Sequence, residues 1–219
     1  MKYYIYISDT KVDMLFPQVP HDVKKKVSTE LGFDLKVLSA KRKVESESDE
    51  NRILRLETVV EFIRKYGKIG SVDEPGEYVE GTQPLRMLYP TYNDKYAAVY
   101  FAGHTDRTAF GLGGSLKHMI GAGFDPNPPI ISRSVGYMML YYLTKNPEIS
   151  WTGDRLETGG LDLVVKAAQV EGGVYQNVEF LAKKLVFENF ERRGIVWSSY
   201  EGSWTQILLA SPLYLALAD

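Results

Sequence analysis

The first residues able to do chemistry lie in the segment Ser8-Asp9-Thr10-Lys11-Val12-Asp13, directly after a short apolar run. Ligands of α/β folds collect where strands end, so Asp9 and Lys11 are candidate ligand-binding residues. Asp9 and Asp13 could also hold a divalent cation through their carboxylate oxygens, and Asp9 could act as a base. The alternative is structural, because Asp and Ser side chains commonly bond their own backbone in turns.

A glycine-rich segment, which contains Gly111, Gly113 and Gly114, is the clearest candidate for binding an anion. Its glycines allow a tight turn, and Ser115 stands where an N-cap would open a helix whose free amides point at the anion. Lys117 could assist there. The spacing matches neither G-x-x-x-x-G-K-[ST] nor G-x-G-x-x-G, so no cognate nucleotide fold is indicated. The alternative is a strand-to-helix turn that binds nothing.

Arg86 is the third candidate, because it interrupts an otherwise apolar extended segment. An arginine in that position needs a carboxylate or an anionic ligand as its partner. The alternative is an arginine on an edge strand that faces water or pairs with Glu77 or Glu80.

No complete catalytic motif is present, because the chain contains neither G-x-S-x-G nor H-E-x-x-H. The catalytic residues and any cofactor are therefore unknown. The leading hypothesis is a non-catalytic ligand-binding or regulatory domain that recognises a small anionic ligand, such as a nucleotide, or a protein partner. The alternative is a metal-assisted phosphoesterase or other hydrolase that uses Asp9 and Asp13, with His104 or His118 moving protons.

The composition narrows the classes of partner. The formal net charge is −2, from 26 basic and 28 acidic residues, so we expect no broad nucleic-acid surface. The chain has no cysteine, which excludes disulfides and thiolate chemistry. No apolar run approaches the ~20 residues that span a bilayer, and a cytoplasmic location without membrane contact is expected. The 15 tyrosines favour a homodimer or a stable partner.

The spacing of apolar residues predicts the elements that must position these candidates. We expect a central strand over 2–7, a loop over 11–18, a helix over 20–31, a strand over 35–44 and a helix over 49–66. An extended segment should follow over 77–89, in which Gly81 and Pro84 break the strand or mark an edge. Further on, we expect a hairpin of 96–102 with 107–112, a short helix after Ser115, helices over 133–145, 159–170 and 176–191, and two or three strands over 194–218, with a bulge or an edge at Pro212.

This order predicts an α+β fold: one domain over residues 1–219, with a mixed, largely antiparallel sheet and a helical block near residues 133–191.

The chain also resembles an uncharacterised family of bacterial proteins of about this length, which open with Y-I-Y-I-S-D-x-K-V-D-M-L. The shared blocks are spread over nearly the whole chain, which favours a single domain, and they cover Tyr4 to Leu15, Gly81 to Arg86, Gly111 to Ser115, Val178 to Leu185 and Ser211 to Ala218. The resemblance supplies no catalytic residue. It implies a place in a bacterial signalling or defence module, which favours a binding function.

Overall fold

The computed structural model describes residues 2–32, 49–89, 91–92, 95–96, 98–121, 162–169, 175–190 and 204–218. Its internal contacts divide the chain into two compact units, a sheet unit of Met1–Ile7 with Gly70–Asp219 and a helical unit of Ser8–Ile69. The predicted strand over 35–44 and the predicted helix over 133–145 lie outside the described residues. That the chain is one domain over 1–219 stays a prediction.

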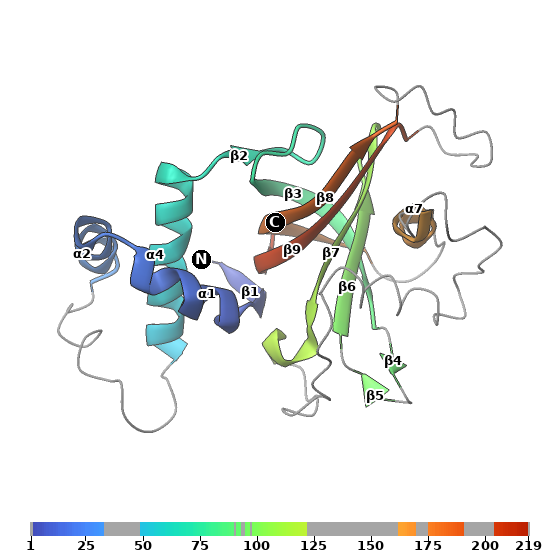
Figure 1. Cartoon of the computed structure of the whole chain (residues 1–219). Coiled ribbons are helices and arrows are strands. Elements are labelled where there is room, and N and C mark those ends of the chain that lie inside the picture. Colours follow the sequence, from blue (N-terminus) through green and yellow to red (C-terminus); the bar gives the residue numbers. More distant parts are fainter. Residues whose placement is uncertain are drawn as a thin grey trace. The chain divides into compact units, whose positions relative to one another are not determined.

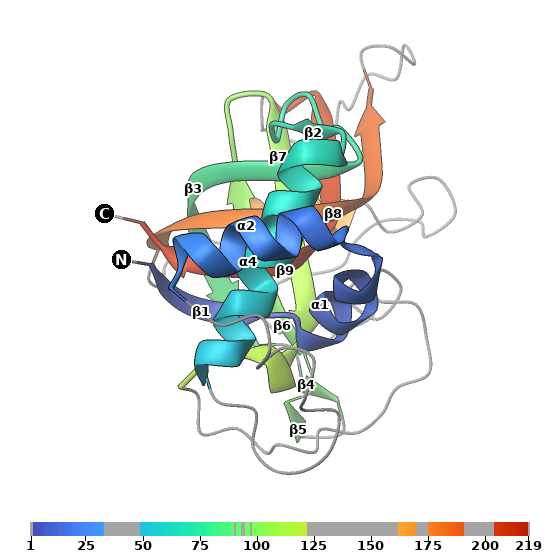
Figure 2. The same ribbon diagram turned by 90° about the vertical axis from the view of Figure 1, so that its left-hand side faces the viewer.

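The helical unit contains α1 (Asp9–Leu15), the 3-10 helix η1 (Phe16–Gln18), α2 (His21–Glu30) and α4 (Asp49–Tyr66). The predictions of helices over 20–31 and 49–66 are confirmed, and Figure 2 shows α2 lying across α4. Val23 and Val27, four residues apart, are buried on one face of α2, as the periodicity requires. The predicted loop over 11–18 is wrong, because α1 begins at Asp9 and runs directly into η1.

The sheet unit is built on strands that close into a barrel (Figure 1). Each neighbour in the ring is hydrogen-bonded to the next, in the order β9 (Gln206–Leu217), β7 (Thr108–Ser115), β6 (Ala98–His104), β3 (Tyr78–Leu88), β8 (Tyr175–Asn189) and back to β9. The β7–β9 pair is parallel and the other pairs are antiparallel, so the predicted mixed, largely antiparallel sheet of an α+β fold is confirmed.

Two short strands, β1 and β2, and one separate pair of strands complete the described strands. β1 (Tyr3–Ile7) pairs with the end of β9, so it stands last in the strand order and the prediction of a central strand is wrong. β2 (Ile69–Gly70) stands at the other end of that order, and the boundary between the two residue ranges falls within it. β4 (Thr91–Tyr92) and β5 (Lys95–Tyr96) form a separate antiparallel pair.

Alternate residues of the barrel strands form two apolar cores on opposite faces of the sheet. Inside the ring, Val99, Phe101, Phe110 and Phe180 belong to one core. On the outer face, Tyr100, Ala102, Ala109 and Leu209 pack with Val164, Val165, Ala167 and Ala168 of α7 (Asp162–Gln169). This helix confirms the one predicted over 159–170, and it lies alongside β6 and β7 in Figure 1.

The predicted helix over 176–191 is wrong, because this segment is the long strand β8. Val178, Phe180 and Ala182 alternate into the inner core, while Leu181 is buried on the opposite face. A strand buried on both faces carries apolar residues at spacings of three and four as well as two, so its pattern imitates a helix. The helical block predicted near 133–191 is thus confirmed only at α7.

Two predicted strand breaks differ from the structure. β3 runs without interruption through Gly81 and Pro84, which pair with Phe180 and Asn177 of β8, so the alternative that they break the strand is wrong and the alternative that they mark an edge stays a prediction. At the C-terminal end, the described residues form a single strand, β9, instead of two or three. Its register with β8 shifts beside Pro212, so the bulge expected there is confirmed.

Candidate functional site

The glycine-rich segment is part of a strand instead of a turn that opens a helix. Gly111, Gly113, Gly114 and Ser115 all lie in β7 and pair with β6 along their length. Ser115 precedes only a three-residue 3-10 helix, η2 (Leu116–His118), and makes no side-chain cap bond. The free helical amides on which the predicted anion cradle depends are therefore absent from this described segment.

Side-chain packing explains why glycine occupies positions 111 and 114. A Cβ at Gly111 would overlap the hydroxyl end of the Tyr100 ring, and a Cβ at Gly114 would overlap that of Tyr6. Among the described glycines, only Gly32 and Gly121 have a positive φ angle, so the backbone conformation of β7 does not require its glycines. β7 is glycine-rich because two tyrosines lie across it, one on each face of the sheet.

Arg86 lies where β3 has a neighbour on both sides, since it pairs with Ala102 of β6 and with Tyr175 of β8. It is 6% exposed, and it is the only lysine, arginine, aspartate or glutamate that is buried in the part of the chain that the structure describes. The alternative of an arginine on an edge strand facing water is therefore wrong. Glu77, one of its two proposed partners, contacts Lys183.

Arg86 shares its face of the sheet with Tyr100 and Gly111. Ala102 of β6 pairs with Arg86 of β3 on one side and with Gly111 of β7 on the other. Two small residues, Ala102 and Gly111, therefore lie beside Arg86 in the same cross-strand row. Tyr100 stands two residues before Ala102, on the same face, and its hydroxyl lies against Gly111. We call this set, Arg86, Tyr100, Ala102 and Gly111, the Arg86 face.

The Tyr100 side chain is fully buried, and its hydroxyl has no hydrogen-bond partner within the described residues. Burial raises the pKa of Tyr100, because the interior disfavours the phenolate. The phenol therefore stays protonated and remains a hydrogen-bond donor. A buried donor of this kind normally costs about 1–3 kcal/mol when it is left unsatisfied.

In the helical unit, Asp9 and Asp13 lie four residues apart on α1, and each contacts an arginine of α4. Arg52 donates to both carboxylate oxygens of Asp9, at 2.7 and 2.9 Å, and Arg55 donates to Asp13 at 2.5 Å. Sequence reasoning missed these partners because they are more than 40 positions away. The described residues contain no group of three or more His, Cys, Asp or Glu that could hold a metal, and the cation site at Asp9 and Asp13 stays a prediction.

Lys11 is partly buried on the same helix, and its Nζ donates to Ser8 Oγ at 3.1 Å. Burial lowers the pKa of Lys11 to about 8, because the charged amine loses solvation. Asp9, Lys11 and Asp13 belong to the helical unit, whereas the other predicted site residues belong to the sheet unit.

A polar cluster at the β6–β7 turn was not predicted from the sequence. The Asp73 carboxylate accepts hydrogen bonds from the hydroxyls of Thr105 and Thr108, both at 2.6 Å. The amide of Gln206, the partner of Thr108 in the β7–β9 ladder, donates to the Thr108 hydroxyl at 2.7 Å. Thr108 and Gln206 are buried, so this cluster fastens the loop around Asp73 to the barrel. A polar residue opening an apolar run, such as Gln206, is the signal that could have found it.

The two histidines considered for proton transfer have separate surroundings. His104 is exposed and its ring lies 4.9 Å from that of Trp204, between centroids. His118 is buried, and its ring lies 5.9 Å from that of Tyr6. Neither contact forms an acid–base pair.

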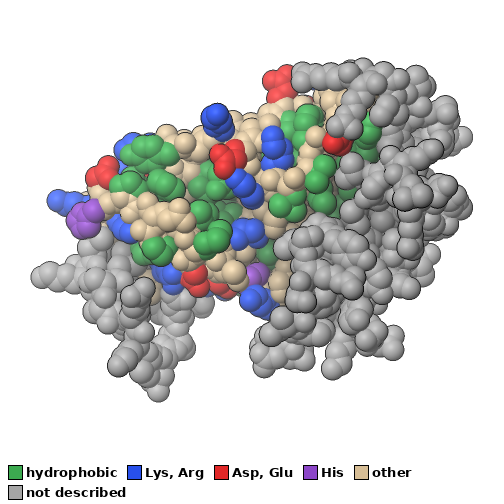
Figure 3. Space-filling model, in the orientation of Figure 1, with side chains coloured by type: hydrophobic (Ala, Val, Ile, Leu, Met, Phe, Trp, Pro, Cys, Tyr) green, Lys and Arg blue, Asp and Glu red, His purple; other side chains and the backbone are tan. Residues whose placement is uncertain are grey.

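Of the predicted ligand-binding residues, the structure brings Arg86, Gly111 and Gly113 to one face of the sheet, because Gly113 pairs with Tyr100. Gly114 faces the opposite core through Tyr6, and Lys117 is exposed on η2. Lysine and arginine side chains lie beside acidic ones on the described part of the surface in Figure 3. None of the helices in the described ranges is both long and apolar enough to span a bilayer.

Comparison with the curated proteins and with the solved structures finds no match for this chain. Comparison with protein families does find one, and it covers the strands of the barrel, the helical unit and the Arg86 face alike. Over residues 2–219 the sequence matches the family of unknown function DUF7019, and the chain belongs to that family.

Proposed function

We propose that this protein is a non-catalytic binding protein that takes a small anionic ligand at the Arg86 face. The observation that carries the proposal is the burial of Arg86, which is the only buried charged side chain within the described ranges. A buried guanidinium attracts an anionic group strongly, because the low dielectric constant of the interior strengthens the interaction between charges. The buried phenol of Tyr100 supplies a second donor on the same face.

The small residues around these donors favour a ligand there. Ala102 and Gly111 leave the backbone of β6 and β7 close to the surface of the sheet beside Arg86. Ligand sites generally combine apolar walls with a few placed polar groups, and the Arg86 face has that composition. Arginine is suited to the role because its planar fork can bind an oxyanion through two hydrogen bonds.

The alternative, a metal-assisted hydrolase, has less support. Its proposed ligands, Asp9 and Asp13, each already contact an arginine, which would compete with a cation for the carboxylate oxygens. An Asp9→Asn variant with unchanged metal content and unchanged phosphodiester hydrolysis would exclude it. A protein partner, a homodimer, a cytoplasmic location and a role in signalling or defence stay predictions.

A thermal-shift screen tests the proposal. The panel contains inorganic phosphate, pyrophosphate, linear and cyclic nucleotides, and aliphatic and aromatic carboxylates. A ligand at a hundred times its Kd should stabilise the folded chain by about 2.7 kcal/mol. The shift should disappear in Arg86→Met and persist in the control Lys117→Met, which removes an exposed cation from η2. A panel without any shift would refute the proposal.

A further inference from the structure

We propose that the Lys11 amine on α1 is a covalent binding site for small aldehydes, which it binds as an imine with the help of the Ser8 hydroxyl. This site is independent of the Arg86 face, because Ser8 and Lys11 belong to the helical unit and Arg86 belongs to the sheet unit. Its basis is the contact between the two side chains, the burial of Ser8 and the position of both residues on one helical turn.

Ser8 and Lys11 are placed together by the first turn of α1. The backbone carbonyl of Ser8 accepts hydrogen bonds from the amides of Lys11 and Val12, both at 3.0 Å. In this turn the Lys11 Nζ lies 3.1 Å from Ser8 Oγ. Ser8 is 2% exposed and Lys11 is partly exposed, so the hydroxyl is shielded from water while part of the lysine side chain meets solvent.

The Ser8 hydroxyl has an unusual role for its position. Ser8 is the N-cap of α1, where a serine side chain normally accepts a hydrogen bond from a backbone amide of the first turn. The Ser8 side chain makes no such capping bond to α1, and it contacts the Lys11 amine instead. A hydroxyl can accept from an ammonium group and donate to a neutral amine, so Ser8 can hold the Lys11 nitrogen in both forms.

The second property that suits Lys11 to this role is the state of its amine at neutral pH. Burial lowers the pKa of Lys11 to about 8 from 10.5, so about one amine in ten is neutral at pH 7. Only the neutral amine attacks a carbonyl carbon, and desolvated lysines serve as nucleophiles in imine chemistry. Burial also lowers the pKa of Lys24, but its Nζ lies over the Phe16 ring, 4.8 Å from the centroid, which favours the ammonium form.

The reaction needs no oxidant or reductant. The neutral Nζ adds to the carbonyl carbon of the aldehyde, and one proton moves from the nitrogen to the former carbonyl oxygen, which gives a carbinolamine. The new hydroxyl leaves as water with the second proton of the nitrogen, and a carbon–nitrogen double bond remains. Ser8 Oγ, already within hydrogen-bond distance of the nitrogen, can accept the first proton and deliver its own to the oxygen.

Reductive trapping in the intact chain tests the proposal. The protein is treated briefly at pH 7 with propionaldehyde and cyanoborohydride, and the propyl groups on each lysine are measured by peptide mass spectrometry. We expect Lys11 to be labelled at least about tenfold faster than Lys25, an exposed lysine of α2, because far more of its amine is neutral. Lys11 should also be labelled faster than Lys24.

Two variants test the part played by Ser8. Ser8→Ala removes the hydroxyl and should slow the labelling of Lys11 about fivefold, which corresponds to one lost hydrogen bond, without changing that of Lys25. Ser8→Thr keeps a hydroxyl and should restore most of the rate, and circular dichroism shows whether both variants fold. Labelling of wild-type Lys11 no faster than that of Lys25 overturns the proposal, whether or not the variants fold. A folded Ser8→Ala protein that is labelled at the wild-type rate overturns it as well.

Discussion

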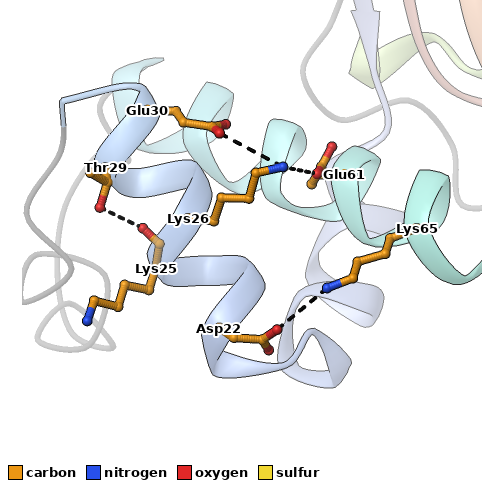
Figure 4. Close-up of polar contacts among 7 residues, drawn as sticks. All are labelled: Asp22, Lys25, Lys26, Thr29, Glu30, Glu61 and Lys65. Carbon is orange, nitrogen blue, oxygen red and sulfur yellow. Dashed lines mark hydrogen bonds and ion pairs between the residues drawn. The ribbon is translucent and has the colours of Figure 1, made fainter.

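The two units of this chain differ in the burial of their polar side chains. In the sheet unit, Thr108, Gln206 and Arg86 are buried and held by the strands around them. In the helical unit, exposed ion pairs join α2 to α4: Lys26 contacts Glu61, and Asp22 contacts Lys65 (Figure 4). Lys26 also contacts Glu30 within α2. Lys25 points away from these pairs in the same view.

The difference determines where a substitution should matter. An exposed ion pair gains little, because water and salt screen it and its side chains lose conformational freedom. A buried polar group that loses its partner cannot turn to water, so the folded state bears the desolvation penalty. Substitutions inside the sheet unit should therefore affect stability far more than substitutions at the α2–α4 surface.

The largest effect is expected at Gly111. Gly111→Ala places a methyl group where the Tyr100 ring lies, and Tyr100 is fully buried, so we expect a loss of about 3 kcal/mol in the free energy of unfolding. Gly81→Ala is the matched control, because its Cβ would meet Phe180 at 3.4 Å, an ordinary contact. Urea denaturation measures both. Equal losses at the two glycines would show that Tyr100 is not the cause.

The next effect depends on pH and comes from Lys11. Its pKa is lowered to about 8 from 10.5, so below pH 8 the folded state must keep a poorly solvated charge. Between pH 8 and 10.5 the folded chain releases that proton first, and the wild type should gain up to about 3 kcal/mol relative to Lys11→Met. Unfolding of both proteins across this range measures the difference. A constant difference would contradict the burial of this amine.

A smaller effect is expected in the polar cluster. Thr108→Val keeps the shape of the side chain but removes the hydroxyl between Asp73 and Gln206, so we expect a loss of about 2 kcal/mol. Thr29→Val is the control, because the exposed Thr29 hydroxyl donates a hydrogen bond to the backbone carbonyl oxygen of Lys25 in α2 (Figure 4). Thermal unfolding should separate the two variants clearly, and similar melting temperatures would argue against a buried network.

The smallest effect is expected at the α2–α4 ion pairs. Lys26→Gln removes a cation that is 56% exposed, and its loss should not shift the denaturation midpoint measurably, even in low salt. A shift as large as that of Thr108→Val would reverse the comparison between the units.

The sequence predicted the helices well where one face alone is buried. In α2 and α4 the apolar residues recur at helical spacing, and both elements appear within a residue of the predicted bounds. It failed at β8, whose residues are buried on both faces, because a strand inside two cores loses its alternation. The barrel closure depends on pairings such as Tyr78 with Lys183, more than 100 positions apart, which no local pattern contains.

The residues of the candidate site also differ in how far the sequence could predict their roles. Arg86 was selected because a charge within an apolar strand is a local signal, and its burial in β3 agrees with the unusual position that the sequence indicated. Gly111 was selected as well, but for turning the chain, whereas its role is to leave room for Tyr100. The neutralisation of Asp9 by Arg52 and the satisfaction of Asp73 by two threonines depend on tertiary contacts. Sequence spacing cannot supply these.

The central claim, an anion at the Arg86 face, is tested most directly by a crystal structure of the protein with the anion that gives the largest thermal shift. We expect that anion about 3 Å from the Arg86 guanidinium, with the Tyr100 hydroxyl donating to it. The same anion bound away from β3 and β6, with only protein atoms at the Arg86 face, would contradict the claim.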